Sequence, residues 1–176
     1  MIQVLDKKFS SFLTADEIQQ RIAELATEIN TDYKGKKITF VVILNGAFMF
    51  ASDLLKQIDV ACEIHFVKVK SYEGMKSTGQ TKEVIGLATD VSGKDVIVVE
   101  DIVDTGITID GISNMLCAND CNSIKIASLL FKPDAFKGVN NPHYVGFSIE
   151  NKFVVGYGLD YDDHGRNLDA IFQLNE

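Results

Sequence analysis

The sequence lacks several features that mark whole classes of protein. No apolar run approaches the length of a membrane span, and the first residues lack a basic region followed by an apolar stretch. The three cysteines, Cys62, Cys117 and Cys121, form neither a Cys-x-x-Cys pair nor a metal-ligand spacing with histidine. We therefore expect a cytoplasmic protein with reduced thiols and no membrane partner.

Basic residues are also scarce. The 17 lysines and arginines are outnumbered by 25 acidic residues, which gives a formal net charge of −8. No lysine- and arginine-rich cluster is interleaved with aromatics, so we expect no nucleic-acid partner. An anionic ligand would need local help from Mg²⁺, helix N-termini and a few basic side chains that the fold brings together.

What is present is typical of one globular domain. The chain has 176 residues, of which 46% are hydrophobic and 24% are charged, enough for one sizeable core. There is no internal repeat, low-complexity tract or linker, so we expect residues 1–176 to form a single domain.

Strand-like and helix-like segments alternate along the chain. Thr14 to Glu17 is a capping-box pattern, and apolar residues follow at helical spacing as far as Ile29. Further segments are predicted as strands at 38–44, 61–72, 84–88, 96–99, 124–131, 144–149 and 153–157, and as helices at 47–57 and 107–118. This order predicts an α/β fold with a mainly parallel sheet flanked by helices, whose ligands bind at the carboxyl ends of the strands.

One polar segment cannot belong to a core. Residues from about 73 to 83 contain no large apolar side chain before the next strand except Met75. We predict a mobile loop there, which suits a lid over an active site, although a plain solvated hairpin loop remains an alternative.

The segment from Val96 to Thr108 carries the strongest functional signal. Val96 to Val99 are apolar, but Glu100 and Asp101 follow directly and are expected to stand at the strand's carboxyl end, outside a dry core. Asp104 to Thr108 form a small-residue turn before a helix, where backbone N–H groups bind phosphate. Acids beside such a turn suggest Mg²⁺ or sugar hydroxyls, and a phosphorylated sugar fits both. The alternative is a strand ending in solvated acids, followed by a helix capped by Asp104 or Thr105.

These thirteen residues resemble the phosphoribosyl-pyrophosphate signature of type I phosphoribosyltransferases. Along nearly its whole length the chain resembles the hypoxanthine (hypoxanthine-guanine) phosphoribosyltransferase family, and it does so in four further places: Leu44–Phe50 at the pyrophosphate loop, Ser71–Tyr72 at the start of the lid, Lys152–Tyr161 at the purine-binding segment, and Arg166. The resemblance implies the type I phosphoribosyltransferase fold, with a small hood built from the chain termini. It also implies a homodimer or homotetramer.

The resemblance implies an enzyme of purine salvage. Ribose 5-phosphate would pass from phosphoribosyl pyrophosphate to a 6-oxopurine, hypoxanthine and probably guanine, which gives IMP or GMP and pyrophosphate. Because C1 of the ribose gains oxocarbenium character as pyrophosphate leaves, negative potential is needed near the sugar and Mg²⁺ and cations near the leaving group.

On the sugar side, the family pattern gives a role to each residue of the signature. Glu100 and Asp101 would hold the ribose hydroxyls, directly or through Mg²⁺. Asp104, next to purine N7, would be the catalytic general base or hydrogen-bond acceptor. The 5-phosphate would be cradled by the backbone and hydroxyls of Asp104, Thr105, Gly106, Ile107 and Thr108.

On the purine and pyrophosphate sides, the roles are again implied by the family. Lys132 would donate to the purine 6-oxygen, Phe153 would stack on the ring, and the backbone at Val154 would read its edge. Asp160, in the purine-binding segment, would hold a second Mg²⁺ on pyrophosphate. The pyrophosphate itself would contact Asn45, Gly46, Ser71, Tyr72 and Arg166. Taken alone, Lys132 would be a solvated strand end, Phe153 a core aromatic, and Asp160 and Arg166 ordinary surface charges.

Two positions depart from the family pattern. Asn45 stands where relatives often have a lysine, and Ile107 where they have a lysine or arginine, so backbone N–H groups must bear more of the phosphate binding. By resemblance, we predict a cis peptide at Leu44–Asn45. Two rival functions remain open: a transferase specific for xanthine or for guanine alone, and a regulator that keeps the site as a sensor and binds RNA. The net charge argues against RNA, and the retained Asp104, Lys132 and Phe153 argue against a dead site.

Overall fold

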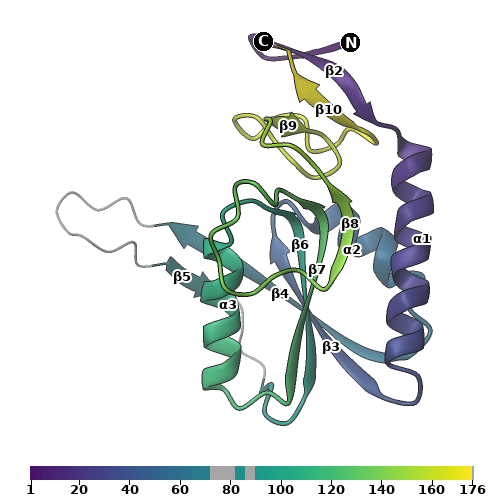
Figure 1. The fold of residues 1–176 in the computed structure, drawn as a ribbon, viewed down its shortest axis with the longest axis vertical. Helices are drawn as coiled ribbons and strands as arrows, with labels where there is room; N and C mark the ends of the chain where they lie inside the picture. The colour runs from purple at the N-terminus through teal and green to yellow at the C-terminus, as the bar shows by residue number, and fades with distance from the viewer. Residues whose placement is uncertain (72–81, 86–89, 176) are drawn as a thin grey trace, which may run out of the picture.

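The computed structural model describes residues 1–71, 82–85 and 90–175 and consists of two sheets (Figure 1). The larger sheet has the strand order β5-β4-β3-β6-β7-β8. Its strands are β3 (Lys37–Leu44), β4 (Ala61–Ser71), β5 (Lys82–Ile85), β6 (Asp95–Val103), β7 (Ser123–Phe131) and β8 (Tyr144–Ser148). All neighbouring pairs are parallel except β4 and β5. The predicted α/β fold with a mainly parallel sheet is confirmed.

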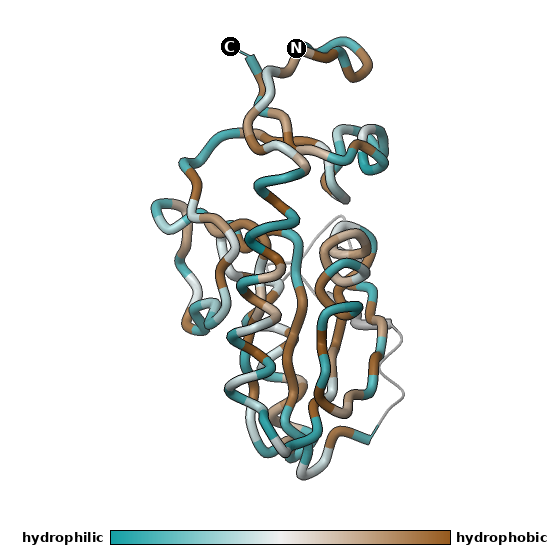
Figure 2. The backbone as a smooth tube through the Cα atoms, turned by 90° about the vertical axis from the view of Figure 1, so that its right-hand side faces the viewer, coloured by the Kyte–Doolittle hydropathy of each residue, from teal (hydrophilic) through white to brown (hydrophobic). Residues whose placement is uncertain are grey.

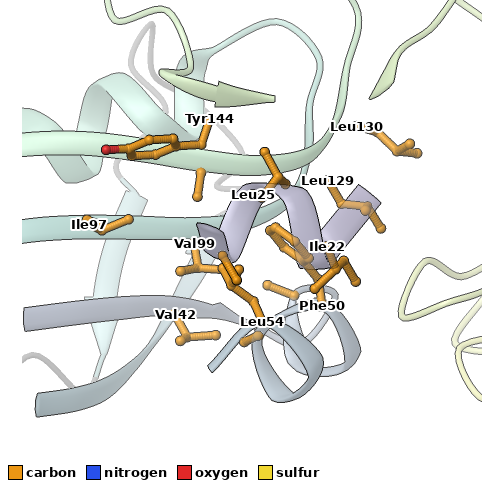
Figure 3. Close-up of a cluster of buried hydrophobic side chains, with 14 of the residues drawn as sticks. Ile22, Leu25, Val42, Phe50, Leu54, Ile97, Val99, Leu129, Leu130 and Tyr144 are labelled. Carbon is orange, nitrogen blue, oxygen red and sulfur yellow. The ribbon is translucent and has the colours of Figure 1, made fainter. Parts of the chain in front are cut away.

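Helices cover both faces of this sheet. α1 (Ala15–Asp32) and α2 (Phe48–Leu55) pack on one face, where Figure 3 shows Ile22, Leu25 and Phe50 against side chains of the central strands. α3 (Ile107–Ala118) packs on the other face. The capping box at Thr14 and Glu17 is formed, and the buried side of α1 is the one that the sequence predicted. In Figure 2 the hydrophobic stretches of the tube run along the strands between these layers.

The second sheet is a small antiparallel hood at one end of the molecule. Its order is β1-β2-β10-β9, with β1 (Ile2–Val4), β2 (Lys7–Leu13), β9 (Val154–Val155) and β10 (Ile171–Leu174). Both termini lie in it (Figure 1). The hood built from the chain termini is confirmed, although the strand predicted at 153–157 has only two residues.

The β6 strand corrects one expectation. It runs on to Val103, so Glu100 and Asp101 lie inside the strand and are buried rather than standing at its exposed end. The reason is that β7 continues beside it and pairs Glu100 with Ser128 and Val103 with Phe131. Both acids are therefore buried within β6, close to its carboxyl end.

Two predictions fall mostly on undescribed residues. Of the loop predicted at 73–83, residues 73–81 lie outside the described part of the chain, and the last two residues belong to β5. The strand predicted at 84–88 is described only as far as Ile85. Within the described ranges, no helix is both long and apolar enough to cross a membrane.

Candidate active site

A cavity of about 260 Å³ lies where β3 and β6 end at the carboxyl edge of the main sheet. It brings together residues of the predicted pyrophosphate loop (44–50), the acidic pair (Glu100 and Asp101), the end of the predicted phosphate turn (104–108) and Arg166. Its lining is Ile43, Leu44, Asn45, Gly46, Val69, Glu100, Asp101, Ile102, Thr108 and Arg166. Larger cavities, of about 580 and 520 Å³, lie at the amino ends of the strands and beside α1. We assign the site to the smaller one because it collects the charged groups and the helix N-terminus.

The two acids of β6 are held tightly inside this cavity. Burial raises the pKa of Asp101, against opposing hydrogen bonds that include one with the Glu100 side chain. Any side chain on Gly46 would overlap the Asp101 carboxylate, so the pyrophosphate loop lies directly on this acid. Two adjacent buried carboxyl groups favour a bound cation or hydroxyl donors, which offset their mutual repulsion. The pair thus fits a divalent metal or sugar hydroxyls.

The phosphate turn leads directly into α3. Gly106 is the N-cap residue, with φ +86°, and no side chain caps the helix. The reading of a helix capped by Asp104 or Thr105 is therefore wrong. The first N–H groups of an α-helix have no carbonyl partner within the helix, so the start of α3 is a position where a ligand phosphate can bind. Ile107 is 53% exposed at this turn.

Lys132 follows β7 and is buried against the turn. Its Nζ donates to Oδ2 of Asp104 at 3.1 Å, and the side chain of Lys132 is only 8% exposed while that of Asp104 is 43% exposed. The reading of Lys132 as a solvated strand end is wrong, because the fold covers it. A donor and an acceptor thus stand side by side at one wall of the site.

Phe153 lies just before β9 and is 45% exposed, which excludes a core role. Its ring is flanked by Tyr161, at 6.0 Å and edge-on, and by Phe9 of β2, at 6.3 Å. Val154 is buried and is held by its pairing with Gln173 of β10. The hood thus presents one aromatic face that a flat ligand can cover.

Asp160 and Arg166 form an ion pair, with 2.7 Å between Oδ1 and Nη2. Nη1 of Arg166 also donates to the carbonyl of Gly158 at 2.9 Å, and Asp163 lies 3.4 Å from Nη2. Both partners are partly buried, so the reading as separate surface charges is wrong. Of the described residues that line the cavity, Arg166 supplies the positive charge.

The pyrophosphate loop contains the predicted cis peptide at Leu44–Asn45. Asn45 is exposed and lines the cavity, as Gly46 does. Ser71 is the last residue of β4, and Tyr72 lies outside the described residues. The cavity therefore holds Asn45 and Gly46 of the predicted pyrophosphate set together with Arg166.

The metal-binding prediction concerns three acids in two places. Among the residues that the structure describes, no three side chains of His, Cys, Asp or Glu converge on one point. Glu100 and Asp101 are adjacent in β6, whereas Asp160 is paired with Arg166. This arrangement suits a divalent cation that takes one or two carboxylates and completes its shell with water and ligand phosphates.

Sequence reasoning placed Gly158 in the purine-binding segment but gave it no role of its own. Its Cα faces the carbonyl of Gly46, so any side chain there would overlap the pyrophosphate loop, and its own carbonyl holds Arg166. The signal was present as Gly156-Tyr157-Gly158, because two glycines around one tyrosine indicate a backbone that must pass close to another segment. Tyr161, which flanks Phe153, was likewise part of that segment without a role of its own.

The chain is similar to known proteins in sequence and in structure. The phosphoribosyl transferase domain matches residues 10–162. The hypoxanthine-guanine phosphoribosyltransferase of Mycobacterium tuberculosis is 40% identical over 173 residues, covering 94% of this chain and 86% of that protein. A crystal structure of a Staphylococcus aureus hypoxanthine phosphoribosyltransferase has a TM-score of 0.87 at 41% identity, covering 97% of this chain and 92% of that one. A Bacillus anthracis hypoxanthine-guanine phosphoribosyltransferase, with HEPES in its active site, has a TM-score of 0.88 at 32% identity and covers 97% and 100%.

Proposed function

Because the chain belongs to the phosphoribosyltransferase family, we propose that it transfers ribose 5-phosphate from phosphoribosyl pyrophosphate to hypoxanthine and guanine. The products are IMP or GMP and pyrophosphate, so the enzyme serves purine salvage. The observation that carries the choice of base is the contact between Lys132 and Asp104, beside the phosphate turn.

A 6-oxopurine matches this pair of side chains. O6 and N7 are neighbours on one edge of the purine ring. The Lys132 ammonium donates to O6, and Asp104 accepts the proton that N7 sheds when N9 attacks the ribose. Adenine presents an amino group in place of O6, and an amino group cannot accept from an ammonium. The pair therefore favours hypoxanthine and guanine over adenine.

The remaining residues orient the two substrates. Phe153 stacks on the purine while the backbone at Val154 contacts its edge. The N–H groups at the start of α3, with Thr105 and Thr108, hold the 5-phosphate, and Gly106 and Ile107 contribute backbone. Asn45, Gly46, Ser71, Tyr72 and Arg166 hold pyrophosphate.

We propose Mg²⁺ as the divalent metal. Glu100 and Asp101 would hold one ion or the ribose hydroxyls directly, and Asp160 would hold a second ion. Bound there, the metal supplies positive charge that stabilises the leaving pyrophosphate. The support is the adjacency of two buried carboxyl groups in the cavity and the raised pKa of Asp101.

We propose that the protein is a single domain of the cytoplasm that assembles as a homodimer or homotetramer. One hydrophobic cluster supports the single domain, because it joins Ile171 of the hood to Phe50 of α2. An uncovered apolar face supports assembly: Phe48, Ile64 and Phe66 are each more than 40% exposed. Since Phe66 pairs with Val42 in the sheet, it faces the α1–α2 side, where α2 does not cover β4. A second copy of the chain would cover it.

The function is tested by initial rates with hypoxanthine, guanine, xanthine and adenine, each with phosphoribosyl pyrophosphate and Mg²⁺. We expect nucleotide from hypoxanthine and guanine and none from adenine. Nucleotide from xanthine alone, or from guanine alone, would contradict the proposed base preference. Nucleotide from none of the four bases would overturn the proposal and favour a sensor.

A further inference from the structure

Tyr157 is the largest side chain that is fully buried, and its backbone is unusual for a tyrosine. Its φ is +50°, between Gly156 at +104° and Gly158 at +99°. Three consecutive residues with positive φ form a tight turn, and non-glycine residues rarely adopt this backbone conformation. We therefore expect the side chain of Tyr157 to make contacts that offset the cost of this backbone conformation.

The side chain reaches both helices on the α1–α2 face of the sheet. Its hydroxyl donates to Oδ2 of Asp53 in α2 at 2.5 Å, and Gln19 of α1 donates to the same oxygen at 2.6 Å. Asp53 also accepts from Lys56. Burial opposes ionisation of Asp53, but these hydrogen bonds outweigh it and lower its pKa, whereas burial and the contact with Asp53 raise the pKa of Tyr157. The phenol is thus a neutral donor to a charged acceptor, which is the stronger kind of hydrogen bond.

The turn that contains Tyr157 contacts two residues of the site. Gly158 lies against the carbonyl of Gly46, and its own carbonyl accepts from Arg166. The backbone N–H of Gly158 donates to the carbonyl of Arg166 at 2.9 Å, and that of Tyr157 donates to Leu168. The pyrophosphate loop leads into α2, which carries Asp53. The phenol therefore joins α2, which continues the pyrophosphate loop, to a turn that contacts Gly46 and Arg166, two residues that line the 260 Å³ cavity.

We propose that Tyr157 and Asp53 are a positioning pair, in which the buried phenol fixes the turn 156–158 against the pyrophosphate loop and thereby sets the affinity for phosphoribosyl pyrophosphate. This role rests on the proposed function. It concerns the pyrophosphate side, because the purine side is held by β10: Val154 pairs with Gln173, and the carbonyl of Phe153 accepts from the N–H of Leu174.

The chain offers a matched control. Tyr144 is also buried and donates to an aspartate of a helix, Asp32 of α1, at 2.7 Å. That contact lies beside the 520 Å³ cavity of α1, away from the pyrophosphate loop. Tyr144→Phe and Tyr157→Phe each remove one hydroxyl from a buried Tyr–Asp hydrogen bond, so both should lower the melting temperature, but only one should change the site.

The experiment measures three quantities for wild type, Tyr157→Phe, Asp53→Asn, Asp53→Ala and Tyr144→Phe: the melting temperature, the KM of each substrate, and the Kd of phosphoribosyl pyrophosphate with Mg²⁺ by calorimetry. We expect Tyr157→Phe to raise both the KM and the Kd of phosphoribosyl pyrophosphate about five- to tenfold, with the hypoxanthine KM changed less than about twofold. Asp53→Asn keeps an acceptor for the phenol and should be milder than Asp53→Ala. The double variant Tyr157→Phe/Asp53→Ala should be no worse than its stronger parent, since both remove the same contact.

Unchanged phosphoribosyl-pyrophosphate binding in Tyr157→Phe, with a loss of melting temperature like that of Tyr144→Phe, would overturn the positioning role. A wild type that forms no nucleotide would overturn the proposed function instead, while the calorimetric comparison would still decide the role of Tyr157. A wild type that binds no phosphoribosyl pyrophosphate would overturn both.

Discussion

At the scale of single residues, the contact between Lys132 and Asp104 has the clearest chemical consequence. The two side chains offer a proton donor and a proton acceptor 3.1 Å apart, next to the N-terminus of α3. In the proposed function each residue serves a different substrate atom, so their roles can be separated by substitution.

Asp104→Asn should lower kcat about 100-fold or more, because the amide keeps the size of the side chain but cannot take the N7 proton. Binding of phosphoribosyl pyrophosphate should change little. Steady-state rates and calorimetry measure the two effects. Lys132→Ala is the counterpart. It leaves the general base Asp104 in place and should mainly raise the hypoxanthine KM. Equal losses of kcat and of phosphoribosyl-pyrophosphate affinity in Asp104→Asn would make Asp104 a structural residue.

His143 gives a prediction about pH and stability. The backbone N–H of Ile126 donates to its Nδ1 at 3.2 Å, so this nitrogen must be unprotonated. Burial and the nearby Lys125 lower the pKa of His143, although Asp32 and Glu28 also line this region. A histidine whose folded pKa is lowered binds protons more readily when unfolded, so its contribution to stability is full above the unfolded pKa of about 6.5 and declines as the pH falls below it.

His143→Asn should flatten this pH dependence, because the amide oxygen can accept the same N–H without titrating. Between pH 7.5 and 5.5 we expect the variant to lose about 0.5 kcal/mol less than wild type, since solvent screens a partly exposed group. Urea unfolding at several pH values measures the difference. Parallel curves for the two proteins would contradict it.

At the scale of elements, the contact between the 156–158 turn and the pyrophosphate loop predicts a costly substitution. Gly158→Ala should destabilise the protein by several kcal/mol, about 3 or more, because the new methyl group overlaps the Gly46 carbonyl in addition to the cost of a positive φ. Gly35→Ala is the matched control: Gly35 has φ +77° and open space around it, so only the backbone cost of about 1 kcal/mol remains. Thermal unfolding compares the two variants. Equal losses of stability would show that the Gly46 carbonyl moves away from the added methyl group at little cost.

The elements also show what local sequence reveals. α1 begins directly after Thr14, as its capping box predicted, and α3 has the predicted bounds 107–118, because helix signals are local. β6 extends past its acids because β7 supplies pairing partners, which lie in a distant part of the sequence. Ile64 and Phe66 of β4 are apolar yet exposed, since whether a helix covers a strand is decided by tertiary packing.

At the scale of the whole molecule, the uncovered face of β4 predicts self-association. Phe66→Glu should shift the protein toward the monomer, because it places a charge on an apolar face that a second copy would cover. Phe66 is half exposed, so folding should be retained, which circular dichroism can check. Phe12→Glu, on the hood, should leave the assembly unchanged. Sedimentation velocity compares the three proteins, and a wild-type monomer would contradict the prediction.

Most of the site could be predicted only from a motif spread along the whole chain. Taken singly, Lys132 is expected in solvent and Phe153 in the core. Both expectations are wrong: distant segments cover Lys132, and Phe153 lies at the surface of the hood. Asp160 and Arg166 gain meaning from their contact with each other. The hood strands β1 and β10 have only three and four residues, too few for periodicity to reveal, and β2 is mostly polar with no regular alternation.

The position of β10 between β2 and β9 sets an order of assembly on the ribosome. The strands of the main sheet, the phosphate turn and α3 all precede residue 149, so the half of the site proposed for the sugar phosphate can be built from nascent chain. β9 has no neighbour in its sheet until residues 171–174 have been translated and have left the exit tunnel. A polypeptide interrupted shortly before that point would carry the sugar-phosphate half without a settled platform for the purine.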